Sequence, residues 1–177
     1  MTPRPAEPVR PSAHEQATHV GLGFDVHAFA PAESGRKLVL GGVTFDSARG
    51  LLGHSDADVL THAVMDALLG AARLGDIGEH FPDSSPEWAG ADSLLLLQKV
   101  KALLAAQGRR VLDIDCVVMA EEPRIAPYRQ QMREKLAGAL DISVEQVGVK
   151  ATTTERLGFV GRAEGIAAAV VALVAWD

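Results

Sequence analysis

Two short stretches of the chain space carboxylate and imidazole side chains regularly. Asp25 and His27 are two residues apart, so both side chains would point to one face of an extended strand. His62 has Asp58 and Asp66 four residues to either side, and a helix would carry all three on one face. We expect Asp58 or Asp66 to accept a hydrogen bond from the second ring nitrogen of His62.

A strand and a helix of this kind could bring Asp25, His27 and His62 together as a metal site. One carboxylate oxygen and two imidazole nitrogens are ligands that suit Zn²⁺. Three protein ligands that leave a fourth position open are typical of catalytic zinc, whereas structural zinc is bound by four. The pattern therefore predicts a zinc ion that takes part in catalysis.

A second polar segment, residues 150–159, could bind phosphate. Its consecutive threonines, Thr152, Thr153 and Thr154, offer hydroxyl and backbone N–H groups to phosphate oxygens. Glu155 could hold a second, hard cation such as Mg²⁺, which often binds a carboxylate and a phosphate together. A polar strand end followed by a helix cap would explain the same residues without any function.

Two other polar groups have both functional and structural interpretations. His54 and Ser55 precede an expected helix N-terminus, which favours bound anions, although His54 could equally be a surface side chain. Arg162 and Glu164 form a charged pair between glycines, a pattern typical of a solvated turn. Neither group predicts a function by itself.

The composition is that of an acidic globular protein. The net charge of −6 argues against nucleic-acid binding, which needs a basic face. The single cysteine, Cys116, excludes an internal disulfide and a cysteine-rich zinc ribbon, and its apolar neighbours indicate a buried side chain. The longest apolar run, residues 166–176, is shorter than the roughly 20 residues of a membrane helix, so we expect a buried strand and no membrane partner.

Residues 1–18 are rich in proline and lack the apolar core of a secretory signal, and their acidic residues argue against a transit peptide. We therefore expect a disordered extension at 1–18, one domain at 19–177 and a cytoplasmic protein.

Hydrophobic periodicity and capping residues predict strands that alternate with helices. The expected strands cover 20–29, 37–45, 111–120, 147–151 and 165–176; the expected helices end near 73 and cover 92–107 and 125–140. Gly41 and Gly42 should bend the second strand. This alternation predicts an α/β fold or an α+β sandwich.

Several motifs occur in a fixed order from about residue 19 to the C-terminus. They are G-F-D-V-H-A-F at 23–29, L-G-G-V at 40–43, G-L-L-G-H-S-D-A-D-V at 50–59, H-A-V-M-D-A-L-L-G-A-A at 62–72, L-G-D-I-G-E-H-F-P-D at 74–83 and K-A-T-T-T-E-R-L-G-F-V-G-R-A-E-G-I-A at 150–167. Together they resemble the family of 2-C-methyl-D-erythritol 2,4-cyclodiphosphate synthases.

The resemblance implies a fold, an assembly and a reaction. The fold would be a mixed β-sheet of about four to five strands with helices on one face, assembled as a homotrimer with the sheets around the threefold axis and active sites between subunits. The substrate would be 4-diphosphocytidyl-2-C-methyl-D-erythritol 2-phosphate of the non-mevalonate isoprenoid pathway. Its 2-phosphate attacks the β-phosphorus, a cyclic diphosphate forms and CMP leaves.

The resemblance also assigns roles to residues. The zinc ligands match Asp25, His27 and His62, with one ion per subunit, and the ligand of a second cation, Mg²⁺ or Mn²⁺, matches Glu155. The catalytic positions that stabilise the transition state match His54 and Thr153. The substrate-binding positions match Asp25, His27, His54, Ser55, Asp76, Ile77, Gly78, Phe81, Pro82, Asp83, Ser84, Ser85, Ala120, Glu121, Glu122, Pro123, Arg124, Ile125, Ala126, Thr152, Thr153, Thr154, Glu155, Phe159 and Arg162.

Three positions depart from the expected pattern. Arg124 stands where the family is expected to use a lysine, and its planar guanidinium offers different geometry to a phosphate. Glu121 and Glu122 add acid beside the implied cytidine pocket, and we expect both side chains to point away from it.

Two other functions fit the same residues. A zinc phosphohydrolase would use the open metal position for hydroxide and release a linear product. A non-catalytic trimeric module would bind a nucleotide or a prenyl phosphate. For the latter ligand, the apolar C-terminal strand could line a cavity on the trimer axis, with Arg162 and Glu164 at its mouth.

Overall fold

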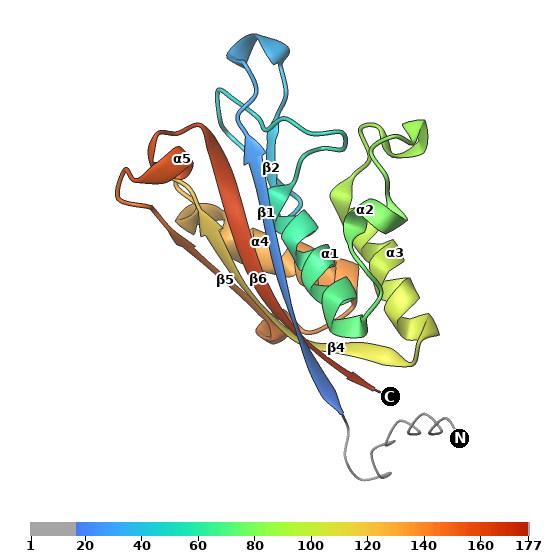
Figure 1. Cartoon of the computed structure of the whole chain (residues 1–177). Coiled ribbons are helices and arrows are strands. Elements are labelled where there is room, and N and C mark those ends of the chain that lie inside the picture. The colour runs from blue at the N-terminus through green and yellow to red at the C-terminus, as the bar shows by residue number, and fades with distance from the viewer. Residues whose placement is uncertain (1–16, 177) are drawn as a thin grey trace, which may run out of the picture.

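The computed structural model describes residues 17–176 and has a mixed four-stranded sheet at its centre (Figure 1). The strand order is β1 (Thr18–Ala28), β6 (Gly165–Trp176), β4 (Arg109–Met119) and β5 (Val147–Thr152). β6 runs antiparallel to both β1 and β4, whereas β4 and β5 are parallel. The predicted mixed sheet of four to five strands is confirmed.

Three long helices cover one face of this sheet. α1 (Val59–Ala72) packs on β1 and β6, α3 (Ser93–Ala106) on α1 and β4, and α4 (Arg129–Leu140) on α3 and β5 (Figure 1). Two further helices are single turns, α2 (Ile77–His80) and α5 (Gly158–Gly161). Short 3₁₀ turns occupy Ala32–Ser34, Pro86–Trp88, Ala126–Tyr128 and Val144–Gln146.

The helix α1 is the centre of the core, and nearly all its side chains are buried. It lies so close to β1 that a methyl group on Gly21 would approach the carbonyl oxygen of Ala67 to 1.9 Å, and one on Gly23 would approach that of Ala63 to 1.9 Å. No side chain fits at these two positions, so only glycine allows the close approach. Because side chains alternate along β1, Asp25 and His27 follow the two glycines on the same face of the strand.

Two predicted elements differ from the structure. The expected strand 37–45 is a hairpin of two strands, β2 (Leu38–Leu40) and β3 (Val43–Phe45), because Gly41 and Gly42 both take positive φ values and reverse the chain. The expected helix 125–140 becomes regular only at Arg129, since Pro127 lies in a 3₁₀ turn and cannot donate a backbone hydrogen bond.

The structure describes only the last two residues, 17 and 18, of the extension predicted at 1–18. The other residues of that extension lie outside the described part of the chain. Thr18 already pairs with Ala175 in the sheet, so the folded domain begins slightly earlier than the expected residue 19. Among residues 17–176, no helix combines the length and the apolar character that a membrane span requires.

Within residues 17–176, no helix covers the other face of the sheet. The outward side chains of β1 are apolar and exposed, namely Val20, Leu22, Phe24 and Val26, and Val171 of β6 joins them. Leu22 is 71% exposed and Phe24 is 55% exposed. Because soluble monomers rarely leave such a contiguous apolar surface in water, this face indicates a contact with another protein surface.

Candidate metal centre and active-site cavity

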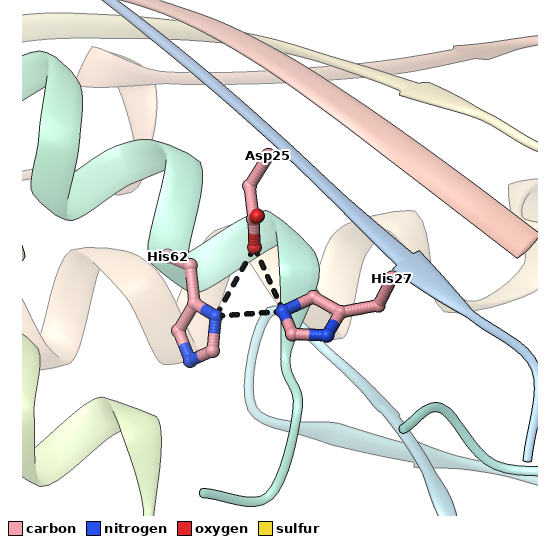
Figure 2. A group of neighbouring side chains, drawn as sticks. All are labelled: Asp25, His27 and His62. Atoms are coloured by element: carbon pink, nitrogen blue, oxygen red, sulfur yellow. Dashed lines mark hydrogen bonds and ion pairs between the residues drawn. The ribbon is translucent and has the colours of Figure 1, made fainter. Parts of the chain in front are cut away.

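Asp25, His27 and His62 converge on one point between β1 and α1 (Figure 2). The Asp25 Oδ2 atom lies 3.0 Å from His27 Nε2 and 3.1 Å from His62 Nδ1, and the two nitrogens lie 3.2 Å apart. The backbone N–H of Val26 donates to Asp25 Oδ1 over 2.8 Å, which turns Oδ2 towards the imidazoles. The strand and the helix predicted from the residue spacing thus bring these three side chains together.

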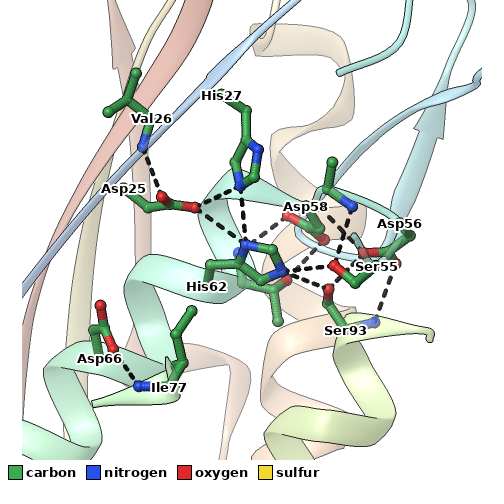
Figure 3. Close-up of polar contacts among 12 residues, drawn as sticks. Asp25, Val26, His27, Ser55, Asp56, Asp58, His62, Asp66, Ile77 and Ser93 are labelled. Carbon is green, nitrogen blue, oxygen red and sulfur yellow. Dashed lines mark hydrogen bonds and ion pairs between the residues drawn. The ribbon is translucent and has the colours of Figure 1, made fainter. Parts of the chain in front are cut away.

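The outer nitrogen of each imidazole has a partner that fixes its proton. His27 Nδ1 lies 2.5 Å from the carbonyl oxygen of Leu52, which can only accept a hydrogen bond. His62 Nε2 lies 3.0 Å from Ser93 Oγ, and this hydroxyl donates to Asp56 Oδ1 over 2.5 Å (Figure 3). Since the Ser93 proton is directed to Asp56, the hydroxyl oxygen accepts from His62. Both rings therefore hold their outer proton and turn a lone pair inward.

The inward group fits a divalent cation. It consists of a carboxylate oxygen and two ring nitrogens, the borderline-hard donor set that zinc prefers. The three separations of 3.0–3.2 Å approach the edge of a tetrahedron, roughly 3.3 Å, around an ion with bonds of about 2.0–2.1 Å. Three donors on one side leave the cavity side open to a further ligand.

Contacts among Asp25, His27 and His62 shift the pKa values of Asp25 and His27. Burial alone would raise the pKa of Asp25, but the hydrogen bonds and the charge of His27 and His62 hold that pKa well below its usual range. Burial alone would lower the pKa of His27, but the hydrogen bond and charge of Asp25 raise it above the usual value. The carboxylate of Asp25 thus favours positive charge on the His27 ring, as it would favour a cation bound at the same point.

The predicted partners of His62 are wrong. Asp58 is the N-cap of α1, fully buried, and its carboxylate accepts from the backbone N–H groups of Gly41, Gly42 and Thr61. Its side chain therefore turns away from the helix face on which a spacing of four residues would place it.

Asp66 is occupied as well, because it accepts from the N–H of Ile77 over 2.9 Å. Ser93 and Ser55 contact His62 Nε2 instead, at 3.0 and 3.1 Å. Ser93 begins α3, and no local pattern in the sequence could have shown that α3 packs beside His62.

A cavity of about 340 Å³ opens beside the triad. It brings together many of the predicted substrate-binding residues: Asp25, His27, His54, Ser55, Ile77, Gly78, Phe81, Pro82 and Asp83. Met65, Trp88 and Leu96 also line it and were not predicted as site residues. The Trp88 ring meets Phe81 edge-on at 5.2 Å and closes the loop side of the cavity.

The loop over the cavity is held by short local contacts. Asp76 caps α2 by accepting from the N–H of Glu79, and Ser85 caps the following 3₁₀ turn. His54 Nε2 lies 3.1 Å from the carbonyl oxygen of Ser85, so this imidazole links the segment that precedes α1 to the loop over the cavity. Asp76, Ser84 and Ser85, which all lie within the described part of the chain, do not line this cavity.

The remaining predicted residues form a second group, in the loops that follow β4 and β5 and in the segment that leads into β6. The loops after β4 and β5, 120–126 and 152–159, lie side by side, and the N–H of Ala120 donates to the carbonyl oxygen of Thr152 over 3.0 Å. β1 and β5 are the two edge strands, three strand spacings or about 14 Å apart. Among residues 17–176, none from these two loops lines the metal cavity.

The side chains of the second group are also placed by the structure. Thr153 Oγ1 donates to Glu155 Oε1 over 2.8 Å, and both residues are exposed. Arg124 and Phe159 are exposed as well. The guanidinium of Arg162 donates to both carboxylate oxygens of Glu164, over 2.8 and 3.1 Å, as expected for a solvated charged turn.

Comparisons with known proteins agree with this geometry. The model of the YgbB family matches residues 18–175. A 2-C-methyl-D-erythritol 2,4-cyclodiphosphate synthase of Thermosynechococcus vestitus is 59% identical over 155 residues, which are 88% of this chain and 94% of that protein. The enzyme of the same name from Symbiobacterium thermophilum is 58% identical over 156 residues, 88% of this chain and 98% of that protein.

Solved structures are similar as well. The bifunctional IspDF of Campylobacter jejuni superposes with a TM-score of 0.87 at 40% identity, covering 92% of this chain and 43% of that longer one. IspF of Plasmodium falciparum, in a complex with CDP, superposes with a TM-score of 0.79 at 28% identity, covering 92% of this chain and 99% of the other.

Proposed function

The chain belongs to the YgbB family, and from this premise we propose that it is a 2-C-methyl-D-erythritol 2,4-cyclodiphosphate synthase. It converts 4-diphosphocytidyl-2-C-methyl-D-erythritol 2-phosphate into the cyclic diphosphate and CMP, a step in the supply of isoprenoid precursors. One structural observation carries this proposal: Asp25, His27 and His62 present three inward donor atoms on the wall of a cavity.

The reaction needs positioning and charge neutralisation more than a base. The nucleophile is an oxygen of the 2-phosphate, which is already anionic. It forms a bond to the β-phosphorus while the bond between that phosphorus and the bridging oxygen breaks, and CMP leaves with the electron pair. Such phosphoryl transfers are governed by in-line placement and electrostatic stabilisation.

The residues of the cavity would supply these needs. Asp25, His27 and His62 would hold zinc, which provides Lewis-acid stabilisation of phosphate charge. His54, whose Nε2 atom contacts the loop carbonyl of Ser85, would in its imidazolium form donate a hydrogen bond from Nδ1 to charge that develops on the diphosphate. Phe81 and Trp88 would exclude water and so favour attack by the internal phosphate over hydrolysis.

The division of the site supports an assembly. Thr153 and Glu155 follow β5, at the opposite edge of the sheet from β1, and do not line the cavity beside the metal triad, so they would complete the cavity of a neighbouring subunit. There Glu155 would hold Mg²⁺ or Mn²⁺ against the diphosphate, and the loop 120–126 would bind the cytidine. The exposed apolar face of β1 offers a surface for such a contact, and we propose a homotrimer.

A prenyl phosphate on the trimer axis and a cytoplasmic location remain expectations. Binding of a prenyl phosphate would involve Arg162 and Glu164, which are exposed and form an ion pair with each other in the single chain.

The product decides between the proposed reaction and its rivals. We expect the purified chain, incubated with the CDP-linked substrate and Mg²⁺, to release CMP with a cyclic product, detected by mass spectrometry. A linear product that has gained water would indicate a phosphohydrolase. CMP binding without turnover would indicate a binding module.

His62→Ala tests the metal ligands directly. Removing one of three ligands should abolish stoichiometric zinc and lower turnover at least about a hundredfold, while the oligomeric state is retained. His80→Ala is the matched control, because His80 contacts the carbonyl oxygen of Leu74 outside the cavity. Full zinc occupancy in His62→Ala would contradict the ligand assignment.

A further inference from the structure

Glu121 has a specific set of partners in the turn that follows β5. Its Oε1 atom accepts hydrogen bonds from the backbone N–H of Thr154 over 3.0 Å and from that of Arg156 over 3.2 Å. The hydroxyl of Thr154 lies 3.4 Å from the same oxygen. One carboxylate oxygen thus collects donors from both ends of a turn whose centre is Glu155.

The backbone of this turn explains why it needs an anion. Glu155 and Arg156 have φ values of 53° and 64°, in the left-handed region that side chains other than glycine rarely adopt. A turn that directs two backbone N–H groups, here those of Thr154 and Arg156, to one side forms a concave cradle for an anion. In this chain the cradle is filled from within, because the carboxylate of Glu121 occupies it.

The neighbouring acid has a different task. Glu122 Oε1 accepts from the guanidinium of Arg49 over 2.9 Å, and this guanidinium lies over the ring of Phe29 at 4.2 Å. Arg49 also reaches the carbonyl oxygen of Ala163, at 3.4 Å. Glu122 therefore ties the loop after β4 to the ends of β1 and β6, while Glu121 alone of the two contacts the turn.

We propose that Glu121 is a positioning residue for the second cation site. Its carboxylate holds the strained turn so that Thr153 and Glu155 stay exposed and oriented together. The role of Glu155 in this statement rests on the proposed function. It follows that the N–H groups of Thr154 and Arg156 are structural and do not bind the substrate phosphates, which leaves that task to Thr153.

The first test measures the turn without reference to catalysis. In the full chain, Glu121→Ala should raise the amide-exchange rates of Thr154 and Arg156 at least tenfold, as measured by NMR. Glu121→Gln keeps an acceptor oxygen and should hold both rates within threefold of wild type. Glu122→Ala is the matched control, because it removes an adjacent carboxylate and should leave these two amides unchanged.

The second test measures the cation. Glu121→Ala should raise the Mg²⁺ concentration for half-maximal CMP release at least fivefold, with an unchanged KM for the CDP-linked substrate at saturating Mg²⁺. Glu121→Gln should restore the wild-type Mg²⁺ dependence, which a merely destabilised protein would not show. If Glu121→Ala does not fold, Glu121→Asp replaces it, because its shorter side chain cannot reach both N–H groups.

Three results would overturn the proposal: unchanged exchange at both amides in Glu121→Ala, an unchanged Mg²⁺ requirement, or a glutamine variant that behaves like the alanine variant. The failure of the proposed function gives a separate result, since the wild-type chain would then form no cyclic product. In that case amide exchange still decides whether Glu121 holds the turn.

Discussion

Among single residues, the three candidate metal ligands depend on groups that lie outside the triad. Asp56 accepts the proton of Ser93, which compels the Ser93 oxygen to accept from His62 Nε2. The backbone carbonyl of Leu52 does the same for His27 Nδ1. These outer contacts choose the tautomer of each ring, and a ring in the other tautomer would direct a proton at the cation.

Ser93→Ala should weaken zinc binding roughly tenfold, because His62 loses the partner that keeps its proton on the outer nitrogen. Competition with a chromophoric chelator would measure the zinc affinity. Ser47→Ala is the control, since Ser47 bonds only within its own turn around Arg49. Equal zinc affinity of Ser93→Ala and wild type would show that Ser55 suffices.

The two pKa shifts in the triad predict contributions to stability that depend on pH in opposite directions. The lowered pKa of Asp25 adds stability above the usual aspartate range, which is lost as the pH falls through its folded-state pKa. The raised pKa of His27 adds stability to the metal-free protein below about pH 6.5, which is lost as the pH rises through its folded-state value.

Zinc must displace the proton of His27, so its affinity should fall as the pH drops below the raised pKa of this ring, by about tenfold per pH unit for one displaced proton. Calorimetry in buffers of different ionisation enthalpy would count the protons released. No proton release near neutral pH would contradict this exchange.

At the scale of elements, Asp58 joins the β2–β3 hairpin to the start of α1. Its two carboxylate oxygens accept from Gly41 at 2.8 Å, from Gly42 at 2.6 Å and from Thr61 at 3.0 Å through the backbone, and at 2.7 Å from the Thr61 hydroxyl. Burial raises the pKa of this carboxyl, although the hydrogen bonds favour its charged form. Because His62 lies one turn after Asp58, this cap sets the position of a metal ligand.

Asp58→Ala should lower the free energy of unfolding by about 3 kcal/mol, because it leaves several buried donors without a partner. Asp92→Ala removes the N-cap of α3, whose bond to Leu94 is exposed, and should cost only about 1 kcal/mol. Urea titration of both variants measures the difference. Similar losses would mean that burial of the Asp58 bonds contributes nothing.

At the scale of the whole molecule, the sheet separates two groups of functional residues. Its order places β1 and the metal triad at one edge, and β5 with the Thr153–Glu155 turn at the other. The helices cover one face, and the apolar side chains of β1 are exposed on the other face. A single chain therefore presents two halves of the proposed site that only an assembly would bring together.

Leu22→Asp should disrupt that assembly, because a carboxylate would be buried at the proposed contact without a partner. We expect a smaller species in sedimentation velocity, and the loss of turnover although zinc still binds. Leu95→Asp is the control: Leu95 is 55% exposed, but it lies on α3, on the opposite side of the sheet. An unchanged sedimentation coefficient for Leu22→Asp would place the contact elsewhere.

Local patterns in the sequence predicted the donor types, the strand and helix that carry the triad, and most element boundaries to within a few residues. These follow from local rules: a period of two in strands, a period near 3.6 in helices, and caps at their ends. The 37–45 hairpin was missed because two successive positive φ values reverse the chain where we expected only a bend.

The contacts between groups that are distant in the sequence follow from the packing of the folded chain. Ser93 is 31 residues from His62 and contacts it because α3 packs on α1. Glu121 is 33 residues from Thr154 and meets it because β4 and β5 lie side by side in parallel. No periodicity encodes such pairs, since they depend on how the elements pack against one another. The same packing, through the strand order, separated Glu155 from the metal triad.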